Sequence, residues 1–273
     1  MQPNYYLKDD DVNIAVYDNQ QQSNSTILFV HGNSLSGAVF KQQFTDEKLN
    51  SFRLISFDLP GHGKSDKAKN PEETYTFQSL VKTVETIFNH LHINNCIVAG
   101  FSLGAHLIMQ NSGSKDNFKG AFLFGYPPVS QLSDLMTCGH PGPALQLAFK
   151  GELTNEEVDI IVNEFLNGNK MGSSEITSFI KQTDPAFRST MITSVAGASL
   201  LNEVEIIESF SNPIALVHLE NDKFVRYDYL QSKNIRNLWK NNIQQIKSAG
   251  HSGFIEKSKD FNSLLFDYAI EIF

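Results

Sequence analysis

The sequence predicts an α/β fold in which a mostly parallel sheet carries helices on both faces. Two observations support this prediction: short, unbroken apolar runs rich in β-branched and aromatic residues, and longer segments of helical periodicity between them. The expected strands are residues 26–31, 52–59, 95–101, 120–126, 213–219 and 243–249. Strands without polar alternation are typical of a parallel sheet that is buried on both sides.

The helices follow from the spacing of their apolar residues. In residues 76–91, apolar side chains recur at intervals of three and four, which is the spacing of one helix face. They are Phe77, Leu80, Val81, Val84, Ile87, Phe88 and Leu91. A last helix is expected at 258–273. The polar stretch 18–27 is turn-like, and we expect it to close a hairpin between residues 13–18 and 26–31.

The domain organisation follows from one long gap between strands. The interval between the expected strands near 125 and 213 is too long for a single crossover helix and holds several amphipathic segments. We therefore expect a helical cap at 129–205, inserted into a core domain formed by residues 1–128 and 206–273. A cap placed there would lie over the strand ends.

Composition excludes several classes of protein. The 273 residues are 41% apolar, which is enough for one substantial core. The net charge is −8 and the basic residues are scattered, whereas a nucleic-acid partner requires clustered Lys and Arg. Cys96 and Cys138 suggest no disulfide framework, and Cys96 is expected to be a buried thiol. With neither a signal-peptide pattern nor a membrane-spanning run, we expect a cytoplasmic protein without membrane contact.

Unusual polar and glycine-rich stretches follow the expected strands. They are HGNSLSG (31–37), DLPGHGKSD (58–66), GFSLGAH (100–106), GYPPVS (125–130), LENDKFV (219–225) and AGHSGF (249–254). In an open α/β sheet, ligands bind outside the carboxyl ends of the strands, so these stretches are expected to meet at one site.

The stretch GFSLGAH fits the G-x-S-x-G pattern of a nucleophile elbow. A sharp turn between strand and helix would leave the Ser102 hydroxyl free at the strand end, and Gly100 and Gly104 would allow the close approach of strand and helix. The alternative is that Ser102 only caps the helix that follows.

A serine hydroxyl needs a base, and that base needs an orienting acid. His251, flanked by glycines after the last expected strand, is the candidate base. Asp222, after the strand at 213–219, is the candidate acid that orients it, and Glu220 is the competitor. Solvated loop positions are the alternative for all three residues.

The oxyanion of an acyl-transfer intermediate needs hydrogen-bond donors placed in advance. The N–H of Leu103, directly after the nucleophile, is one candidate, and Asn33 in the loop after residues 26–31 is the other. Asn33 could instead only shape the turn. PGHGKS is not a phosphate loop, because that pattern would need glycine where Asp58 stands. The histidines show no ligand spacing, so we expect no metal and no cofactor.

These segments, in this order and spacing, resemble the α/β-hydrolase superfamily over essentially the whole chain. The resemblance implies an eight-stranded, mostly parallel sheet flanked by helices, a helical cap after strand 6 and a Ser-His-Asp triad. Ser102 followed by Leu103 departs from haloalkane dehalogenases, which place Asp and Trp at this pair.

In finer detail, HGNSLSGAVFKQQF, DLPGHGKS, SLGAH, GYPPV, NDKFV and NLWKNNIQQIKSAGHSGFIEKSKDF look like the metal-independent α/β-hydrolase type of N-acyl-homoserine lactone hydrolase, which silences bacterial quorum signals. That resemblance implies Ser102, Asp222 and His251 as the triad, with Asn33 and Leu103 as the oxyanion hole. In this family the acid can be a glutamate, so Asp222 is a mild departure.

The expected function is therefore a serine hydrolase of small esters or lactones. A carboxylesterase or a carbon–carbon bond hydrolase could use the same triad, and a non-catalytic receptor could use the same fold. Four apolar residues of the expected cap either pack in a core or line an acyl tunnel: Val158, Ile161, Val162 and Phe165.

Overall fold

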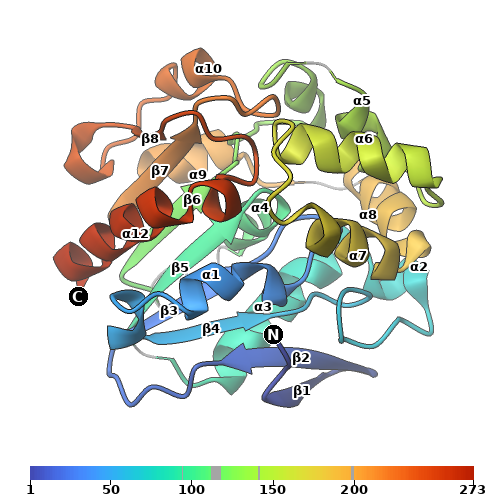
Figure 1. Cartoon of the computed structure of the whole chain (residues 1–273), viewed down its shortest axis with the longest axis horizontal. Coiled ribbons are helices and arrows are strands. Elements are labelled where there is room, and N and C mark those ends of the chain that lie inside the picture. Colours follow the sequence, from blue (N-terminus) through green and yellow to red (C-terminus); the bar gives the residue numbers. More distant parts are fainter. Residues whose placement is uncertain (94, 112–117, 141, 198–199) are drawn as a thin grey trace.

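A single eight-stranded sheet forms the centre of the molecule in the computed structural model (Figure 1). The structure describes residues 1–93, 95–111, 118–140, 142–197 and 200–273. The strands are β1 (Tyr5–Asp9), β2 (Val12–Asp18), β3 (Thr26–Val30), β4 (Arg53–Phe57), β5 (Cys96–Phe101), β6 (Gly120–Phe124), β7 (Ile214–Leu219) and β8 (Gln244–Ile246). Their order is β1-β2-β4-β3-β5-β6-β7-β8, and β3 to β8 run parallel, which confirms the predicted fold class.

Helices cover both faces of this sheet, as predicted. They are α1 (Lys41–Phe44), α2 (Pro71–Thr74), α3 (Phe77–His90), α4 (Leu103–Gln110), α5 (Pro143–Leu147), α6 (Asn155–Phe165), α7 (Ser173–Gln182), α8 (Pro185–Gly197), α9 (Glu203–Ser209), α10 (Tyr227–Gln231), α11 (Gly253–Glu256) and α12 (Ser258–Ile272). Leu80 of α3 joins one buried apolar cluster, whereas Phe261 and Leu265 of α12 join the other. None of the helices in the described part of the chain has the length and apolar content to cross a bilayer.

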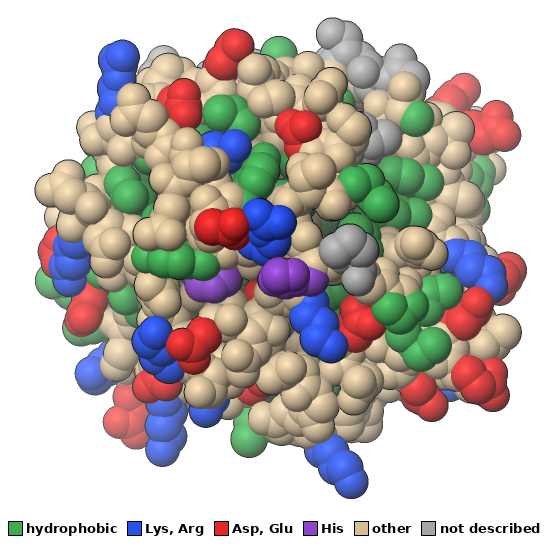
Figure 2. All heavy atoms as spheres, turned by 90° about the horizontal axis from the view of Figure 1, so that it is seen from above, with side chains coloured by type: hydrophobic (Ala, Val, Ile, Leu, Met, Phe, Trp, Pro, Cys, Tyr) green, Lys and Arg blue, Asp and Glu red, His purple; other side chains and the backbone are tan. Residues whose placement is uncertain are grey.

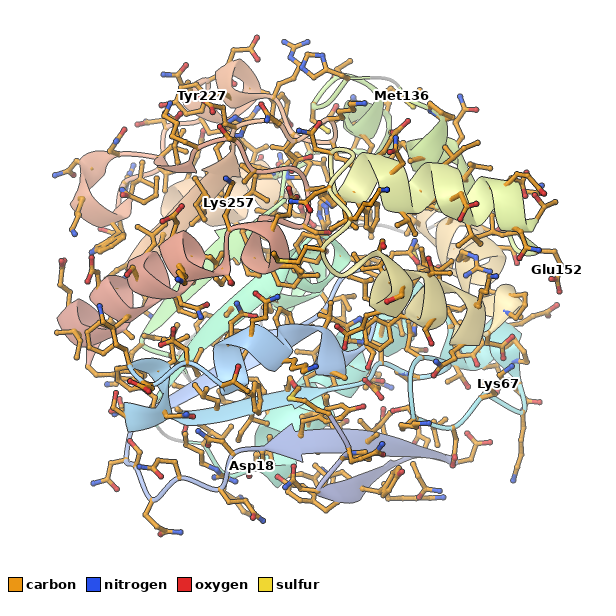
Figure 3. The ribbon with its side chains drawn as sticks, in the orientation of Figure 1. Asp18, Lys67, Met136, Glu152, Tyr227 and Lys257 are labelled. Carbon is orange, nitrogen blue, oxygen red and sulfur yellow. The ribbon has the colours of Figure 1, made fainter. Side chains whose placement is uncertain are left out.

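The expected hairpin between residues 13–18 and 26–31 is wrong. Strand β2 pairs antiparallel with β1 and with β4, and β3 lies between β4 and β5. Because every residue of β3 is buried, this strand needs a neighbour on each side. It therefore lies further inside the sheet than the position next to β2, and β4 later fills the place between β2 and β3. The ion pair between Asp18 and Arg53, at 2.6 Å, fastens β2 to β4 (Asp18 is labelled in Figure 3).

The segment between β6 and β7 contains α5 to α9. Helix α8 packs against α2 and α3, and α9 packs against α4. The expected cap boundary at residue 205 falls inside α9, so this helix begins in the segment and ends against the sheet domain. The division into core and cap domains stays a prediction.

Charged side chains are mixed on the surface. Figure 2 shows a face on which acidic and basic side chains are interspersed, with small apolar patches between them. Cys96 is a buried free thiol, as predicted, and Cys138 is also free and buried. Burial raises the pKa of each thiol to about 12, which disfavours the reactive thiolate.

Asp58 ties together two of the loops that follow the strands. Its buried carboxylate accepts hydrogen bonds from the Ser36 hydroxyl and the Gly37 N–H, both at 2.6 Å, in the loop after β3. It also accepts from the Tyr17 hydroxyl at 2.9 Å and the Lys64 N–H at 2.7 Å. Since four donors converge on one buried carboxylate, its removal leaves several buried groups unpaired.

Replacing Asp58 with alanine should lower the free energy of unfolding by about 3 kcal/mol or more, because three buried donors, from Tyr17, Ser36 and Gly37, lose their acceptor. Urea unfolding followed by circular dichroism measures this loss. Asp267→Ala, at an exposed position of α12, is the matched control and should change stability by less than about 0.5 kcal/mol. Equal stability of the two variants would contradict the assigned role of Asp58.

Candidate active site

Ser102 lies at a sharp turn between β5 and α4. Its backbone has φ 50° and ψ −119°, which is a left-handed conformation that non-glycine residues rarely adopt. The Ser102 N–H donates to the carbonyl of Phe124 at 3.1 Å, so the turn is anchored to the end of β6. The hydroxyl makes no capping hydrogen bond to α4, and the reading of Ser102 as a simple helix cap is therefore wrong.

Small residues make this turn possible. A Cβ atom on Gly100 would lie 2.7 Å from the Cα of Ala105, and one on Gly104 would collide with the backbone carbonyl of Val30. Strand and helix approach so closely that neither position has room for a side chain. On the other side of the turn, a Cβ on Gly32 would lie 3.2 Å from the Cβ of Ser102. The loop after β3 is thereby in contact with the serine.

Asp222 and His251 form a buried pair. The Oδ2 atom of Asp222 lies 2.8 Å from Nδ1 of His251, and the two residues are 5% and 2% exposed. The other carboxylate oxygen accepts the Phe224 N–H at 2.7 Å, which fixes the orientation of the acid. Because a carboxylate accepts, the pair places an imidazole proton on Nδ1, and in the neutral form of the ring the lone pair is on Nε2.

Glu220, the competing acid, points elsewhere. Its carboxylate accepts a hydrogen bond from the Ser248 N–H at 2.8 Å and pairs with the Lys247 ammonium at 3.0 Å. Both partners lie in the exposed turn after β8. These two hydrogen bonds are the largest causes that lower the pKa of Glu220.

Phenyl rings enclose the imidazole of His251. The ring centroids of Phe101, Phe165 and Phe224 lie 4.8, 5.1 and 4.5 Å from that of His251. A Cβ on Gly125, directly after β6, would lie 2.8 Å from its Cε1, so the imidazole stands at the strand end beside Ser102. Within the described residues no hydrogen bond joins the Ser102 hydroxyl to His251; such bonds often tighten only when substrate binds.

One cavity joins these side chains. The space inside it, together with the solvent at its open mouth, is about 920 Å³. Most of the wall is apolar, and the polar or titratable side chains on it are Asn33, Ser102, His106, Cys138, Glu203 and His251. Of the four apolar residues proposed for an acyl tunnel, only Phe165 lines the cavity; Val158, Ile161 and Val162 are packed in an apolar cluster.

Residues 27–264 match the model of the alpha/beta hydrolase family. The chain belongs to this family. Two solved structures of N-acyl homoserine lactonase AidH, one complexed with N-hexanoyl homoserine lactone and one with N-butanoyl homoserine, superimpose with TM-scores of 0.90. They are 27% and 26% identical to this hydrolase, and the matches cover 97% of its chain and 96% and 95% of theirs.

Other relatives are more distant. AB hydrolase superfamily protein YisY from Bacillus subtilis is 20% identical over 257 residues, 89% of this chain and 91% of its own. An esterase-type structure from Burkholderia cenocepacia, described as a putative aryl esterase, has a TM-score of 0.81 at 17% identity over 98% of both chains. At that identity the likeness shows the fold alone. The comparisons confirm the family and the predicted resemblance to the lactonase.

The side chain of Asn33 links the loop after β3 to the helical segment of the hydrolase. Its amide nitrogen donates to the Ala148 carbonyl at 2.7 Å, and its oxygen accepts from the Ser34 hydroxyl at 2.8 Å. Arg188 of α8 extends this series of hydrogen bonds. It donates to the Ser34 hydroxyl at 3.2 Å and to the Lys150 carbonyl at 2.8 Å. The Asn33 side chain is thus engaged within the protein.

The two expected oxyanion donors lie at the cavity wall. Both Asn33 and Leu103 line it, and Leu103 is the first residue of α4, where helix N–H groups lack intrahelical partners. In the described part of the chain neither backbone N–H donates to a protein group. Both backbone N–H groups are therefore left to donate to a ligand.

One polar pair on the cavity wall was not predicted from the sequence. His106 and Glu203 are 97 residues apart and make contact at 2.8 Å. Only its position in the first turn of the helix that follows Ser102 could have indicated the histidine. No group of three or more His, Cys, Asp or Glu side chains in the described ranges is arranged to hold a metal ion.

Glu256 supports the loop that carries His251. Its carboxylate accepts the Gly250 N–H at 3.0 Å, directly before the histidine. The side chain is half-buried, and this burial is the largest cause that raises the pKa of Glu256 to about 7. The folded hydrolase therefore holds this proton at pH values where the unfolded chain has lost it.

Glu256→Gln should be more stable than the wild type above pH 7 by about 1 kcal/mol, a figure reduced for the solvent screening of a half-exposed group. The wild type loses stability as the pH rises from about 4.5 to 7, because the unfolded chain releases the proton first. Below that window the two proteins should be equal. Urea unfolding between pH 4 and 8 checks this, with exposed Glu47→Gln as the control; parallel wild-type and Glu256→Gln profiles would contradict it.

Proposed function

We propose that this chain is a metal-independent serine hydrolase that opens the lactone ring of N-acyl homoserine lactones. The observation that carries the proposal is the strained turn that presents Ser102 to the same cavity as the buried Asp222–His251 pair. A nucleophile, a base in a fixed tautomer and an apolar binding space are the parts that acyl transfer requires.

In the first half of the reaction, the Ser102 oxygen attacks the lactone carbonyl and His251 Nε2 takes the hydroxyl proton. Asp222 keeps the Nδ1 proton in place and stabilises the imidazolium that forms. The backbone N–H groups of Asn33 and Leu103 receive the developing oxyanion. When the ring C–O bond breaks, His251 returns its proton to the departing alkoxide, and the acyl group remains on Ser102.

In the second half, His251 takes a proton from water as the water oxygen attacks the acyl-enzyme. The carbonyl bond to Ser102 then breaks, the serine regains its proton, and a hydroxy acid leaves. The alcohol formed from a lactone stays attached to the acyl group, so it competes with water to close the ring again. An apolar wall around the ester favours this chemistry because it strengthens the electrostatic contribution of the oxyanion donors.

The lactone is proposed as the substrate on two grounds. The AidH structures, which are described with N-acyl homoserine lactone or its product, match this chain over nearly its whole length. The cavity wall is mainly apolar and includes Leu145, Phe149 and Ile192, which suit an acyl chain. A carboxylesterase would use the same serine and histidine and differ only in the substrate.

Ser102→Ala should lower kcat on N-hexanoyl homoserine lactone by at least about 10³-fold, because no other group in the cavity replaces the nucleophile. Mass spectrometry should show the wild-type product as substrate plus one water with the amide intact. Wild-type protein should also react with a fluorophosphonate probe, and the variant should not. Ser232→Ala, on the surface, is the control. Simple-ester turnover without lactone opening would indicate the carboxylesterase, and a wild type that neither reacts nor labels would indicate a non-catalytic receptor.

Asp222→Asn should lower kcat by about 10³- to 10⁴-fold with little change in KM, because the amide favours the wrong imidazole tautomer. Glu220→Gln is the matched control, since it removes the neighbouring carboxylate that bonds to Lys247 and Ser248 instead. Steady-state kinetics of both variants on one substrate separates the two acids. A larger loss in Glu220→Gln than in Asp222→Asn would reverse the assignment.

A further inference from the structure

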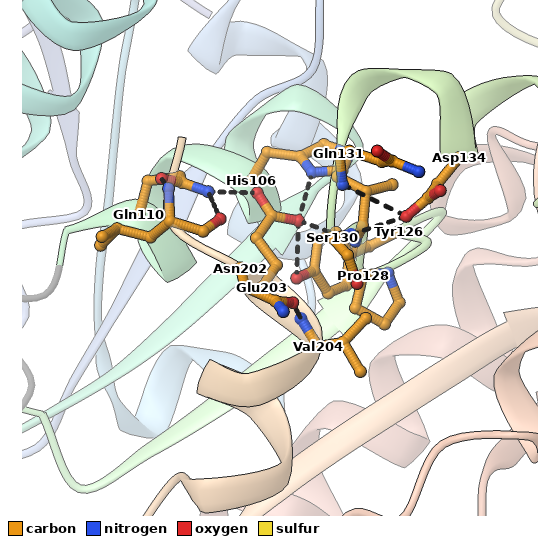
Figure 4. A network of polar contacts seen from close by, with 12 residues as sticks. His106, Gln110, Tyr126, Pro128, Ser130, Gln131, Asp134, Asn202, Glu203 and Val204 are labelled. Carbon is orange, nitrogen blue, oxygen red and sulfur yellow. Dashed lines mark hydrogen bonds and ion pairs between the residues drawn. The ribbon is translucent and has the colours of Figure 1, made fainter. Parts of the chain in front are cut away.

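A second histidine–carboxylate pair lies on the wall of the cavity that Ser102 and His251 also line. Glu203, at the start of α9, is 1% exposed, and its carboxylate accepts hydrogen bonds from four groups (Figure 4). The donors are His106 Nδ1 at 2.8 Å, Gln110 Nε2 at 3.0 Å, the Tyr126 hydroxyl at 3.1 Å and the Val129 N–H at 3.3 Å. A carboxylate surrounded by donors in this way is satisfied as the anion.

This arrangement fixes the proton of His106. Because a carboxylate accepts, Nδ1 of His106 carries the proton that faces Glu203, and in the neutral form of the ring the lone pair is on Nε2. The Tyr126 ring packs edge-on against the imidazole with centroids 4.8 Å apart, which limits its rotation. His106 lines the cavity and its side chain keeps 14% exposure, so Nε2 is the ring nitrogen that a ligand can reach.

His106 stands one helical turn from the nucleophile. The His106 N–H donates to the Ser102 carbonyl at 3.3 Å, and both residues line the same cavity. With Ser102 bonded to the reacting carbonyl carbon, an acceptor on this part of the wall can meet a group attached to the neighbouring carbon. In an N-acyl homoserine lactone, the amide nitrogen is attached to that carbon.

We infer that His106, held by Glu203, is the subsite for an N–H donor next to the reacting carbonyl. The substrate class is then α-acylamino lactones and esters, as opposed to lactones and esters that carry a plain alkyl chain at that carbon. The inference rests on the proposed function for the chemistry at Ser102. The hydrogen bonds around Glu203 then contribute to substrate selection, and they also join α9 to α4.

The first test compares matched substrates with the wild-type protein. One pair is N-hexanoyl homoserine lactone and an α-alkyl-γ-butyrolactone of equal chain length, and the other is an N-acylglycine ester and the corresponding alkanoate ester. Each member with an amide should have a kcat/KM at least about tenfold higher than its partner, because an unpaired acceptor in an apolar cavity costs about 1 to 3 kcal/mol. Equal values within both pairs would overturn the inference.

The two pairs separate this inference from the proposed function. Rapid opening of both lactones without preference leaves the lactonase function in place and removes the role of His106. Turnover of esters alone, with preference for the acylamino ester, removes the lactonase function and retains the subsite.

The second test uses His106→Phe, which keeps a ring against Tyr126 and removes both nitrogens. The ratio of kcat/KM for the amide member to that for the alkyl member of each pair should fall about tenfold towards one, and His106→Gln, whose amide oxygen can accept, should restore part of it. His90→Phe, at the exposed end of α3, is the matched control and should leave the ratio unchanged. A purely structural role would lower activity on both members equally, so an unchanged ratio in His106→Phe overturns the inference.

Discussion

The backbone of Ser102 is the constraint on which the site depends. A serine held at positive φ is strained, and it persists only because the surrounding structure leaves the chain no alternative. The alternatives are excluded by the contact of Gly100 with α4, by the contact of Gly104 with β3 and by the hydrogen bond from Ser102 to the end of β6. The same close approach brings the first N–H groups of α4, the loop after β3 and the end of β6 to one point. The cavity forms where these three meet.

Much of this arrangement could be predicted from the sequence, since it depends on local pattern. Unbroken apolar strands indicate a parallel sheet, and the flanking glycines of Ser102 indicate the turn. The strand pairing at the edge of the sheet was harder to predict from the sequence. Strand β1 alternates half-buried and exposed residues and gives little apolar signal, and its pairing with β2 was therefore not expected. The false hairpin arose because adjacency in sequence was taken for pairing, whereas a fully buried β3 requires two parallel neighbours.

Side-chain partners across the chain were the least predictable. Asp222 and Glu220 lie two residues apart after the same strand, and only the folded turn, in which Glu220 meets Lys247, separates them. The contact between His106 and Glu203 joins α4 to a helix that enters the sheet domain from the long insertion. Helical periodicity likewise identified the apolar face of α6 but could not assign Phe165 to the cavity and Val158 to the apolar cluster.

The chain of hydrogen bonds that runs from Asn33 through Ser34 and Arg188 has a consequence for how such enzymes diverge. In the helical segment, the groups that it uses at positions 148 and 150 are backbone carbonyls. Every residue type supplies a backbone carbonyl, so a substitution at either position keeps the acceptor. Substitutions at neighbouring wall positions such as Leu145 and Phe149 can therefore accumulate while the loop beside Ser102 keeps its supports. The shape of the cavity is thus free to drift over generations without a matching change around the serine.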